Sequence, residues 1–241
     1  MSDKYQQTLF EDFQIKFVKR ARQKNLRIRI KNNLVTVSGP LTCRERVMRD
    51  FLNQNLTWVE KTLNKQSTRT QKLDHYREQY RNHIMLYGEW LPVQRSSYKT
   101  AKNGWLLKQK DGILWFTPPD NVDDYPDTDL LNQYLKQRAK PEILSRFAEF
   151  APTTPFQYNR IFIRSQKTKW GTCSGKGNLS FNWRLIKCPI WVWDYLFVHE
   201  LCHTVHFNHS KPFWDLVDKH CPRRKEAEAW LKQNGDVVFQ M

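Results

Sequence analysis

Residues 190–203, IWVWDYLFVHELCH, place a chemical motif at the end of a mainly apolar run. The run from Trp191 to Val198 predicts a buried helix, and the motif HExxH follows it directly. Because a helix turns once every 3.6 residues, His199 and His203 project from the same face about 6 Å apart. Two imidazoles at that spacing can bind one metal ion, and Glu200 lies close enough to reach a water molecule on that ion.

Chance is a poor explanation of this motif. The chain has seven histidines in 241 residues, and with glutamate at roughly 5% of positions only ~0.01 accidental matches are expected. The competing interpretation is a helix whose two histidines only satisfy hydrogen bonds. We therefore predict a metal site in this segment.

A catalytic zinc ion usually has three protein ligands and an open position for water, so a third ligand is needed. His206 is rejected because three ligands in a row along one helix cannot surround a single ion. His209 is preferred, since the chain can leave the helix and return, and Asn208 tolerates the turn that this requires. Glu226 and Glu228, on the helical stretch RRKEAEAWLK, stay as alternatives.

The N-terminal third predicts a small sheet and a long helix. Residues 13–38 alternate apolar and polar side chains, with Asn32-Asn33 at a turn, which indicates an antiparallel hairpin or meander. Thr42 to Glu45 is typical of a capping box, and helical spacing then continues to Leu63, so one helix of about twenty residues is expected. Residues 66–83 are polar and predict either a linker or an exposed continuation of the helix.

The middle of the chain predicts further strands and a second helix. Three aromatic-rich runs within residues 84–118 are separated by turn residues that include Asn103-Gly104 and Asp111-Gly112, and the latter pair is a strong hairpin signal. Residues 130–150 have helical periodicity. Pro141 lacks a backbone donor and should kink or split that helix.

The net charge of +16, from 40 Lys and Arg against 24 Asp and Glu, bears on the partners of the protein. It favours salt-sensitive contact with DNA or another polyanion. Eight cations lie between Lys16 and Lys31, interleaved with the apolar residues of the predicted strands. A basic surface that serves only solubility explains the charge equally well, so both interpretations stay open.

The cysteines and the absence of an apolar segment indicate the compartment. Five cysteines, an odd number at wide spacing without a CxxC pair, predict reduced thiols. No run approaches the roughly 18 apolar residues of a membrane span, and the N-terminal stretch is polar. We expect a cytoplasmic protein without membrane contact.

Four blocks of the chain resemble the YgjP-like metallopeptidases, which are related to the SprT-like and WLM groups of zincin-type proteases. They are similar in order and spacing to the family's WGxCS, LxxN, HELxH and HSxxFW blocks. The tight match covers roughly residues 160–235. The blocks are Lys167–Ser174 (KTKWGTCS), Leu179–Asn182 with Leu185, Tyr195–His203 (YLFVHELCH) and His209–Trp214.

The resemblance implies one Zn²⁺ ion per chain, held by His199, His203 and His209, with Glu200 as the catalytic acid and base. This agrees with the choice of His209 made from the turn after the helix. The resemblance thus implies a complete catalytic metal site within one short segment.

The same resemblance concerns residues outside the motif. Trp170 and Gly171 are expected on a strand beside the active-site helix, where zincins bind an extended substrate; packing in the core is the alternative, and it is favoured for Trp170. Phe213 and Trp214 are expected to pack the last helix against the active-site helix. Contact of these two side chains with substrate is the less favoured interpretation.

These observations predict a zinc-dependent metallopeptidase of the HExxH type. It would hydrolyse the peptide bonds of a protein or peptide with a metal-activated water, and Glu200 would be the general base. The alternative is a zinc-stabilised, basic nucleic-acid-binding protein without catalysis. That protein would not need Glu200, because a structural zinc prefers four closed ligands and no base. A third reading, an accidental motif in an interaction protein, predicts no bound zinc.

The predicted architecture is α+β. Residues 160–164 and 178–185 are expected to be strands, and the chain should be mainly helical from about residue 191. We expect an N-terminal strand-rich region followed by a zincin-like region, in which a small sheet packs on the HExxH helix. The predicted domains are residues 1–120, strand-rich with one long helix, and residues 121–241, the zincin-like metallopeptidase region.

Overall fold

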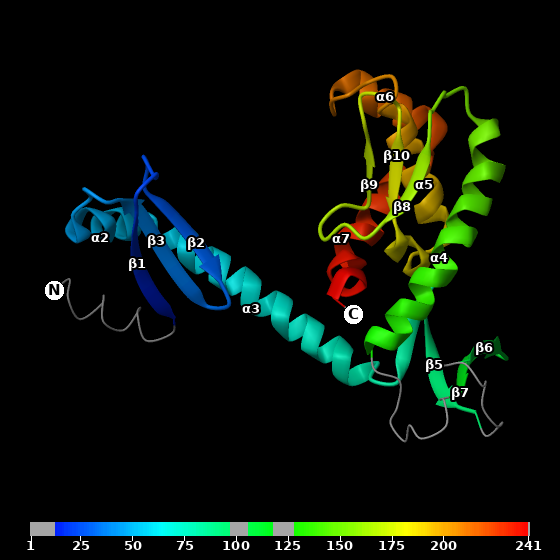
Figure 1. Cartoon of the computed structure of the whole chain (residues 1–241), viewed down its shortest axis with the longest axis horizontal. Helices are drawn as coiled ribbons and strands as arrows, with labels where there is room; N and C mark the ends of the chain where they lie inside the picture. Colours follow the sequence, from blue (N-terminus) through cyan, green and yellow to red (C-terminus); the bar gives the residue numbers. More distant parts are fainter. Residues whose placement is uncertain (1–12, 97–105, 118–127, 241) are drawn as a thin grey trace. The chain divides into compact units, whose positions relative to one another are not determined.

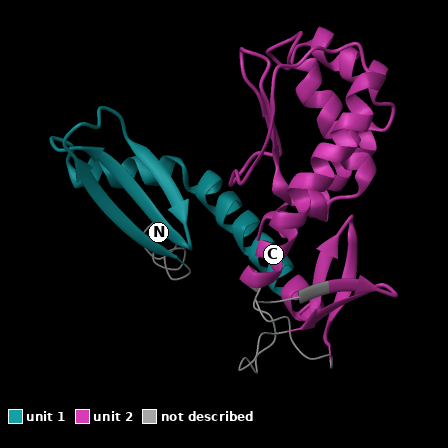
Figure 2. Cartoon of the chain, turned by 45° about the vertical axis from the view of Figure 1, so that its right-hand side comes forward, with its two compact units in different colours: residues 1–74 teal, residues 75–241 magenta. Residues whose placement is uncertain are grey.

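The structure is a computed structural model that describes residues 13–96, 106–117 and 128–240. The chain forms two compact units, residues 1–74 and residues 75–241, and each is described by itself (Figure 2). Helices and three small sheets make up the described residues, which confirms the predicted α+β class. The predicted domains, residues 1–120 and 121–241, divide the chain at a different residue and stay a prediction.

The sheet of unit 1 has the strand order β1-β3-β2 (Figure 1). Strands β2 and β3 form the expected antiparallel hairpin, in which Asn32 and Asn33 both have positive φ, 49° and 57°. The alternative of a meander is wrong, because β1 pairs in parallel with β3. That pairing sets Ile15 opposite Val35 on the core side. The strands are β1 (Gln14–Arg20), β2 (Arg27–Lys31) and β3 (Leu34–Pro40).

Two helices, α2 (Glu45–Gln54) and α3 (Leu56–Gln79), replace the single predicted helix. The helix breaks at Asn55, whose backbone leaves the helical region and whose side-chain amide donates to the Phe51 carbonyl. The predicted capping box is also wrong, since Arg44 is the N-cap and makes no side-chain cap hydrogen bond. Residues 66–79 are helical, which favours the exposed helix over a linker. The core of this unit is Val35, Val37, Met48, Leu52 and Val59.

Unit 2 begins with a four-stranded sheet of order β4-β5-β7-β6. The hairpin predicted at Asp111-Gly112 is confirmed, with φ of 52° and 73° at the two turn residues. Tyr87 and Gly88 form a second turn of the same kind. The predicted turn at Asn103-Gly104 lies outside the described residues. The strands are β4 (His83–Leu86), β5 (Glu89–Arg95), β6 (Leu106–Lys110) and β7 (Ile113–Thr117).

Helix α4 (Thr128–Phe150) is not split, although Pro141 lies inside it. Proline removes one helical hydrogen bond, whereas one face of the helix is buried on both sides of Pro141. That burial holds the two halves in one helix against the core. The buried residues follow at intervals of four: Leu135, Ala139, Ile143 and Phe147. A short 3-10 turn, η1 (Ala151–Thr153), follows.

The third sheet has the order β8-β10-β9 and packs on helix α5, as predicted for the HExxH helix (Figure 1). The rings of Phe181 on β10 and Phe197 on α5 have centroids 5.0 Å apart. The strand predicted to reach residue 185 ends at Asn182 and continues as a 3-10 helix. The elements are β8 (Ile161–Arg164), β9 (Gly171–Cys173), β10 (Leu179–Asn182), η2 (Trp183–Lys187), α5 (Ile190–Cys202), α6 (Lys211–His220) and α7 (Arg224–Gln240).

Two further observations concern the cysteines and the described helices. All five cysteines are free and form no disulfide. Among the described helices, none combines the length and the apolar character that crossing a membrane would require.

Candidate metal centre

Helix α5 positions the HExxH motif. Most of its residues from Val192 to Cys202 are buried, so the helix is fixed in the core of unit 2. His199 and His203 lie one turn apart on the same face, and their ring centroids are 4.9 Å apart. The helix ends at Cys202 with His203 as its C-cap, and both imidazoles are half-buried at that end.

His209 forms a cluster with these two histidines. One nitrogen from each of the three imidazoles lies within 4.8 Å of the others, and the Nε2 atoms of His209 and His199 are 3.1 Å apart. Within the described ranges, this is the one group of three or more side chains suited to a metal ion. The side chain of His206 is not part of it. The structure thus brings together the three histidines that the sequence predicted as ligands.

Aromatic side chains at the start of α6 hold two of the imidazoles. The ring of Phe213 stacks on His203 at 4.4 Å, and the ring of Trp214 stacks on His209 at 5.4 Å. Phe213 is fully buried. The predicted packing against α5 therefore runs directly through the histidines, but these two residues lie on α6, whereas the last helix is α7.

Hydrogen bonds orient the rings of His199 and His203. His203 Nδ1 donates to the backbone carbonyl of His206 at 2.9 Å, which leaves Nε2 with its lone pair. His199 Nδ1 lies 3.5 Å from the Tyr195 hydroxyl, which in turn donates to Glu228 at 3.2 Å. Such partners fix the tautomer and the orientation of metal-binding histidines.

The two glutamates that the sequence left open as ligands lie outside the cluster. Glu226 pairs with Arg223 at 2.8 Å, and both side chains are more than half exposed. Glu228 accepts hydrogen bonds from Arg224 and from Tyr195. Tyr195 was not predicted to have this supporting role, although its position four residues before His199 puts the two on one helical face.

Two of the imidazoles, those of His199 and His203, have a lowered pKa. Burial, with smaller contributions from the neighbouring His203 and His209, lowers the pKa of His199 to about 3. Burial also lowers the pKa of His203. Neutral imidazole is the form that binds metal.

The distance between two of these nitrogens fits a zinc ion. Two nitrogens bound at about 2.0–2.1 Å to a tetrahedral ion lie roughly 3.3 Å apart, which is close to the 3.1 Å between His209 and His199. His209 is exposed, so solvent reaches the cluster. The three histidines can therefore hold a divalent metal and leave one position for a water molecule.

Glu200 lies beside this cluster in an unusual environment. Its side chain is 4% exposed, and its Oε2 atom has no hydrogen-bond partner. Burial raises the pKa of Glu200 to about 8, and the positive charge of Lys169 opposes this rise. An unsatisfied buried carboxylate is unfavourable, so such a group is a candidate for chemistry.

Gly171 and Trp170 have different surroundings. A Cβ atom at Gly171 would lie 2.4 Å from Glu200 Oε1, so the absence of a side chain lets β9 pass next to this carboxylate. The Trp170 ring packs on Phe239 of α7, with centroids 4.5 Å apart. Gly171 therefore belongs to the site, whereas the indole of Trp170 is directed toward α7.

Comparisons with known proteins agree with this chemistry. A family profile described as YgjP-like, metallopeptidase domain, matches residues 24–234. No curated protein matches the chain. A crystal structure of the metallopeptidase zymogen of Pyrococcus abyssi abylysin is 25% identical over 42% of this chain and 92% of that chain, with a TM-score of 0.30. A TM-score this low carries no argument, so the family assignment depends on the profile.

Proposed function

The chain belongs to the YgjP-like metallopeptidase family, and we propose that it hydrolyses peptide bonds with one zinc ion held by His199, His203 and His209. One observation carries the proposal: three imidazoles converge beside Glu200, a buried carboxylate with an unsatisfied oxygen. Three ligands, an open position and a neighbouring base are the parts of a catalytic zinc site of the HExxH type.

The protein's own residues would perform the proton transfers. A bound zinc ion supplies Lewis-acid polarisation of the substrate carbonyl and a lowered pKa for water. Glu200 takes a proton from the attacking water and delivers it to the leaving amine. Burial places the pKa of Glu200 near neutrality, where a group both accepts and returns a proton effectively.

Strand β9 offers a place for the substrate, which we propose to be a protein or peptide. It pairs with β10 on one side and is the edge strand of its sheet. Gly171 starts this strand next to Glu200. An extended peptide can add to such an edge through main-chain hydrogen bonds, which would bring its carbonyl toward the metal. Trp170 would then support the strand from behind through its packing on α7.

A purely structural zinc site explains the geometry less well. Structural zinc prefers four closed ligands, whereas the group found in the described residues has three members. Cys202 is on the same helix, but it is fully buried, and burial raises the pKa of its thiol to about 12. A non-catalytic site also gives no reason for an unsatisfied carboxylate at Glu200.

Two further predictions concern partners and location. The family match gives no support for contact with nucleic acid. Binding of DNA or another polyanion therefore stays a separate proposal, and it depends on residues of unit 1. Cytoplasmic location also stays a prediction.

Metal analysis of purified protein tests the proposed site. We expect one zinc per chain in the wild type and in Glu226→Ala, and loss of zinc in His209→Ala. Circular dichroism of each variant would show that the fold is kept. A wild-type protein that binds no zinc even when zinc is supplied would overturn the proposal, as would a folded His209→Ala variant that keeps full occupancy.

A further inference from the structure

The outer face of the unit 1 sheet is a regular array of polar and basic side chains. Side chains alternate along each strand, so the face opposite the core carries every second residue. The strand register puts Lys16, Thr36 and Arg29 in one row across the three strands. The next rows bring Arg27 beside Ser38 and Lys31 beside Leu34.

The cations of this face have no acidic counterpart. Residues 13–44 contain nine Lys and Arg and no Asp or Glu. The five cations on the outer face are exposed, and none makes an ion pair with a described residue. A surface of this kind attracts anions. The five are Lys16, Arg20, Arg27, Arg29 and Lys31.

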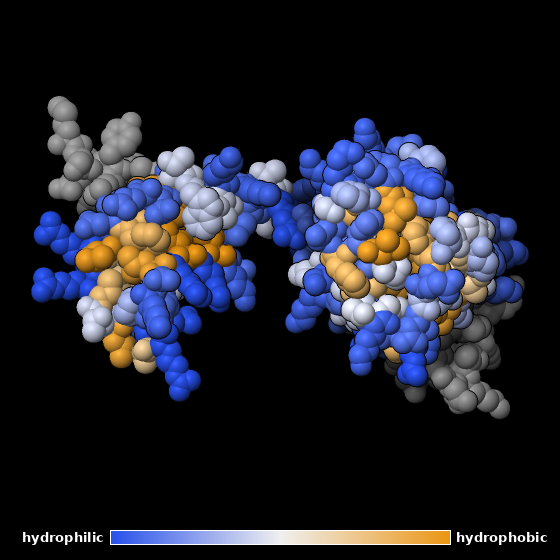
Figure 3. Space-filling view, turned by 90° about the horizontal axis from the view of Figure 1, so that it is seen from above, coloured by the Kyte–Doolittle hydropathy of each residue, from blue (hydrophilic) through white to orange (hydrophobic). Residues whose placement is uncertain are grey.

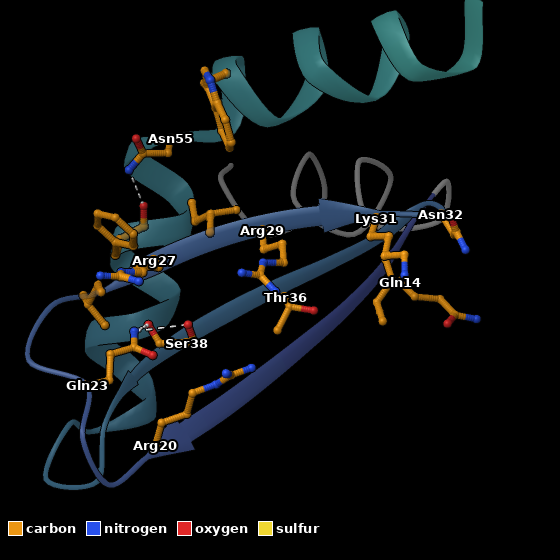
Figure 4. Close-up of a pocket in the computed structure, with 15 residues that line it drawn as sticks. Gln14, Arg20, Gln23, Arg27, Arg29, Lys31, Asn32, Thr36, Ser38 and Asn55 are labelled. Atoms are coloured by element: carbon orange, nitrogen blue, oxygen red, sulfur yellow. Dashed lines mark hydrogen bonds between the residues drawn. The ribbon is translucent and has the colours of Figure 1, made fainter. Parts of the chain in front are cut away.

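One exposed aromatic side chain, Trp58, lines the same hollow as four of these cations, Arg20, Arg27, Arg29 and Lys31. This open hollow of about 950 Å³ is lined by residues of all three strands together with Phe51 and Trp58 (Figure 4). Trp58 is 51% exposed, an unusual state for so large an apolar side chain. On the body that carries the N-terminus, apolar surface is bordered by hydrophilic side chains (Figure 3).

We propose that this hollow binds a single-stranded nucleic acid. Proteins that bind single strands combine a positively charged groove along the backbone with aromatic side chains on which bases stack. Arg27, Arg29 and Lys31 follow one another on β2 at intervals of about 7 Å, the spacing of alternate residues on a strand. Successive phosphates of an extended strand can contact successive cations at such a spacing. Trp58 then provides a stacking surface.

The same features argue against an acidic polypeptide as the ligand. Aspartate and glutamate side chains would pair with the cations but would leave the exposed indole of Trp58 without an aromatic ring to stack on it. Duplex DNA is also a poorer fit, because its bases already stack on one another and cannot stack on the indole of Trp58. The inference is independent of the peptidase chemistry, since its residues all lie in unit 1.

Fluorescence anisotropy with the full-length, zinc-loaded protein tests the proposal. The probes are a labelled oligothymidine of about 20 nucleotides and a duplex of equal length. We expect Arg27→Gln/Arg29→Gln/Lys31→Gln to weaken binding to the single strand more than tenfold. The slope of log K against log salt should fall by about 2, since each phosphate contact on a single strand contributes about 0.7.

A matched variant controls for the loss of net charge. Lys136→Gln/Lys140→Gln/Lys232→Gln removes three exposed lysines from unit 2 and should change binding less than twofold. Trp58→Ala should weaken single-strand binding about tenfold, the scale of one stacked base, with little effect on the duplex. Thermal unfolding followed by circular dichroism checks that every variant is folded.

Four outcomes would overturn the proposal. They are no binding at 50 mM salt, equal weakening by the two triple variants, tighter binding of the duplex, and displacement by heparin with no effect of Trp58→Ala. The last would indicate a general polyanion surface without base stacking. All four differ from a failure of the peptidase proposal, which would leave the anisotropy results unchanged.

Discussion

The most distinctive charged side chains of the two units have opposite surroundings. In unit 2, Glu200 is buried beside the histidine cluster, and the partly exposed Arg146 on α4 pairs with Asp194 of α5 through two hydrogen bonds of 3.0 and 2.7 Å. In unit 1, the cations of the outer sheet face are exposed and have no partner among the described residues. Burying charge is unfavourable, so buried charge that persists is usually paired or reactive. Exposed charge carries little such penalty and is free to meet a ligand.

The hydrophobic cores of the two units also differ. Unit 1 has a small core of five buried residues between one sheet face and its helices. Helix α5 is buried along most of its length, with Phe181, Phe147 and Phe150 around Phe197. A close-packed surround fixes side-chain positions tightly, which a catalytic site requires and a binding face does not. The comparison suggests chemistry in unit 2 and recognition in unit 1.

The largest effect should come from Glu200→Gln. Loss of a general base lowers the rate by about 10²–10⁴-fold, while the three histidines should keep their zinc. The measurement is the release of new amino termini from an unstructured polypeptide, with metal content determined on the same sample. Arg27→Gln/Arg29→Gln/Lys31→Gln is the counterpart in unit 1 and should hydrolyse a short peptide at the wild-type rate. Equal losses of peptidase activity in both variants would contradict the division of roles between the units.

A smaller effect is expected from Gly171→Ala. The new Cβ would lie 2.4 Å from Glu200 Oε1 and 2.7 Å from its Cγ, so the carboxylate must move. We expect roughly tenfold or greater loss of activity with zinc retained, and a free energy of unfolding lower by about 1–3 kcal/mol.

Gly175→Ala is the matched control, because a Cβ at Gly175 meets no atom within 4 Å. Both variants should be compared by steady-state kinetics and by urea unfolding. An active Gly171→Ala variant would mean that Glu200 does not need its observed position.

The remaining prediction concerns the stability of the fold alone, and a buried cation in unit 2. Lys187 is 3% exposed and donates to Asn132 at 2.8 Å. Burial, with a smaller contribution from the charge of Arg184, lowers the pKa of Lys187 to about 7. The unfolded chain has an ordinary lysine pKa near 10.4. Between about pH 7 and 10.4, the unfolded chain therefore binds a proton that the folded chain has released.

It follows that Lys187 makes the free energy of unfolding rise with pH across this window, by at most about 1.4 kcal/mol per pH unit. Denaturant unfolding at several pH values would detect this as a difference between the wild type and Lys187→Met, which should lack the rise. The exposed Lys136→Gln is the control and should follow the wild type. Identical profiles for Lys187→Met and the wild type would show that Lys187 is not buried as a neutral amine.

Local patterns in the sequence were sufficient for several features. The apolar run before HExxH predicted helix α5, because helical period and burial are read from neighbouring residues. Asn32-Asn33 and Asp111-Gly112 predicted their hairpins, because positive φ is a property of the turn residues themselves. The histidine cluster was also predicted, as two residues one helical turn apart and a third reached by a short turn.

Other features depended on contacts between distant residues. The parallel pairing of β1 with β3 and the break at Asn55 follow from packing on the unit 1 core. No periodic pattern among neighbouring residues predicts them. The continuity of α4 through Pro141 likewise depends on what its apolar face meets.

At the site, the sequence by itself determined which side chains can bind a metal and which can act as a base, since these are properties of residue type and spacing. Only the tertiary structure decided that Gly171 lies against Glu200, that Trp170 packs on α7, and that Glu228 supports Tyr195 instead of joining the cluster. The reason is physical: residues that are 29 or 33 positions apart in the chain meet only when the sheet and helices pack, and their distances are set by that packing.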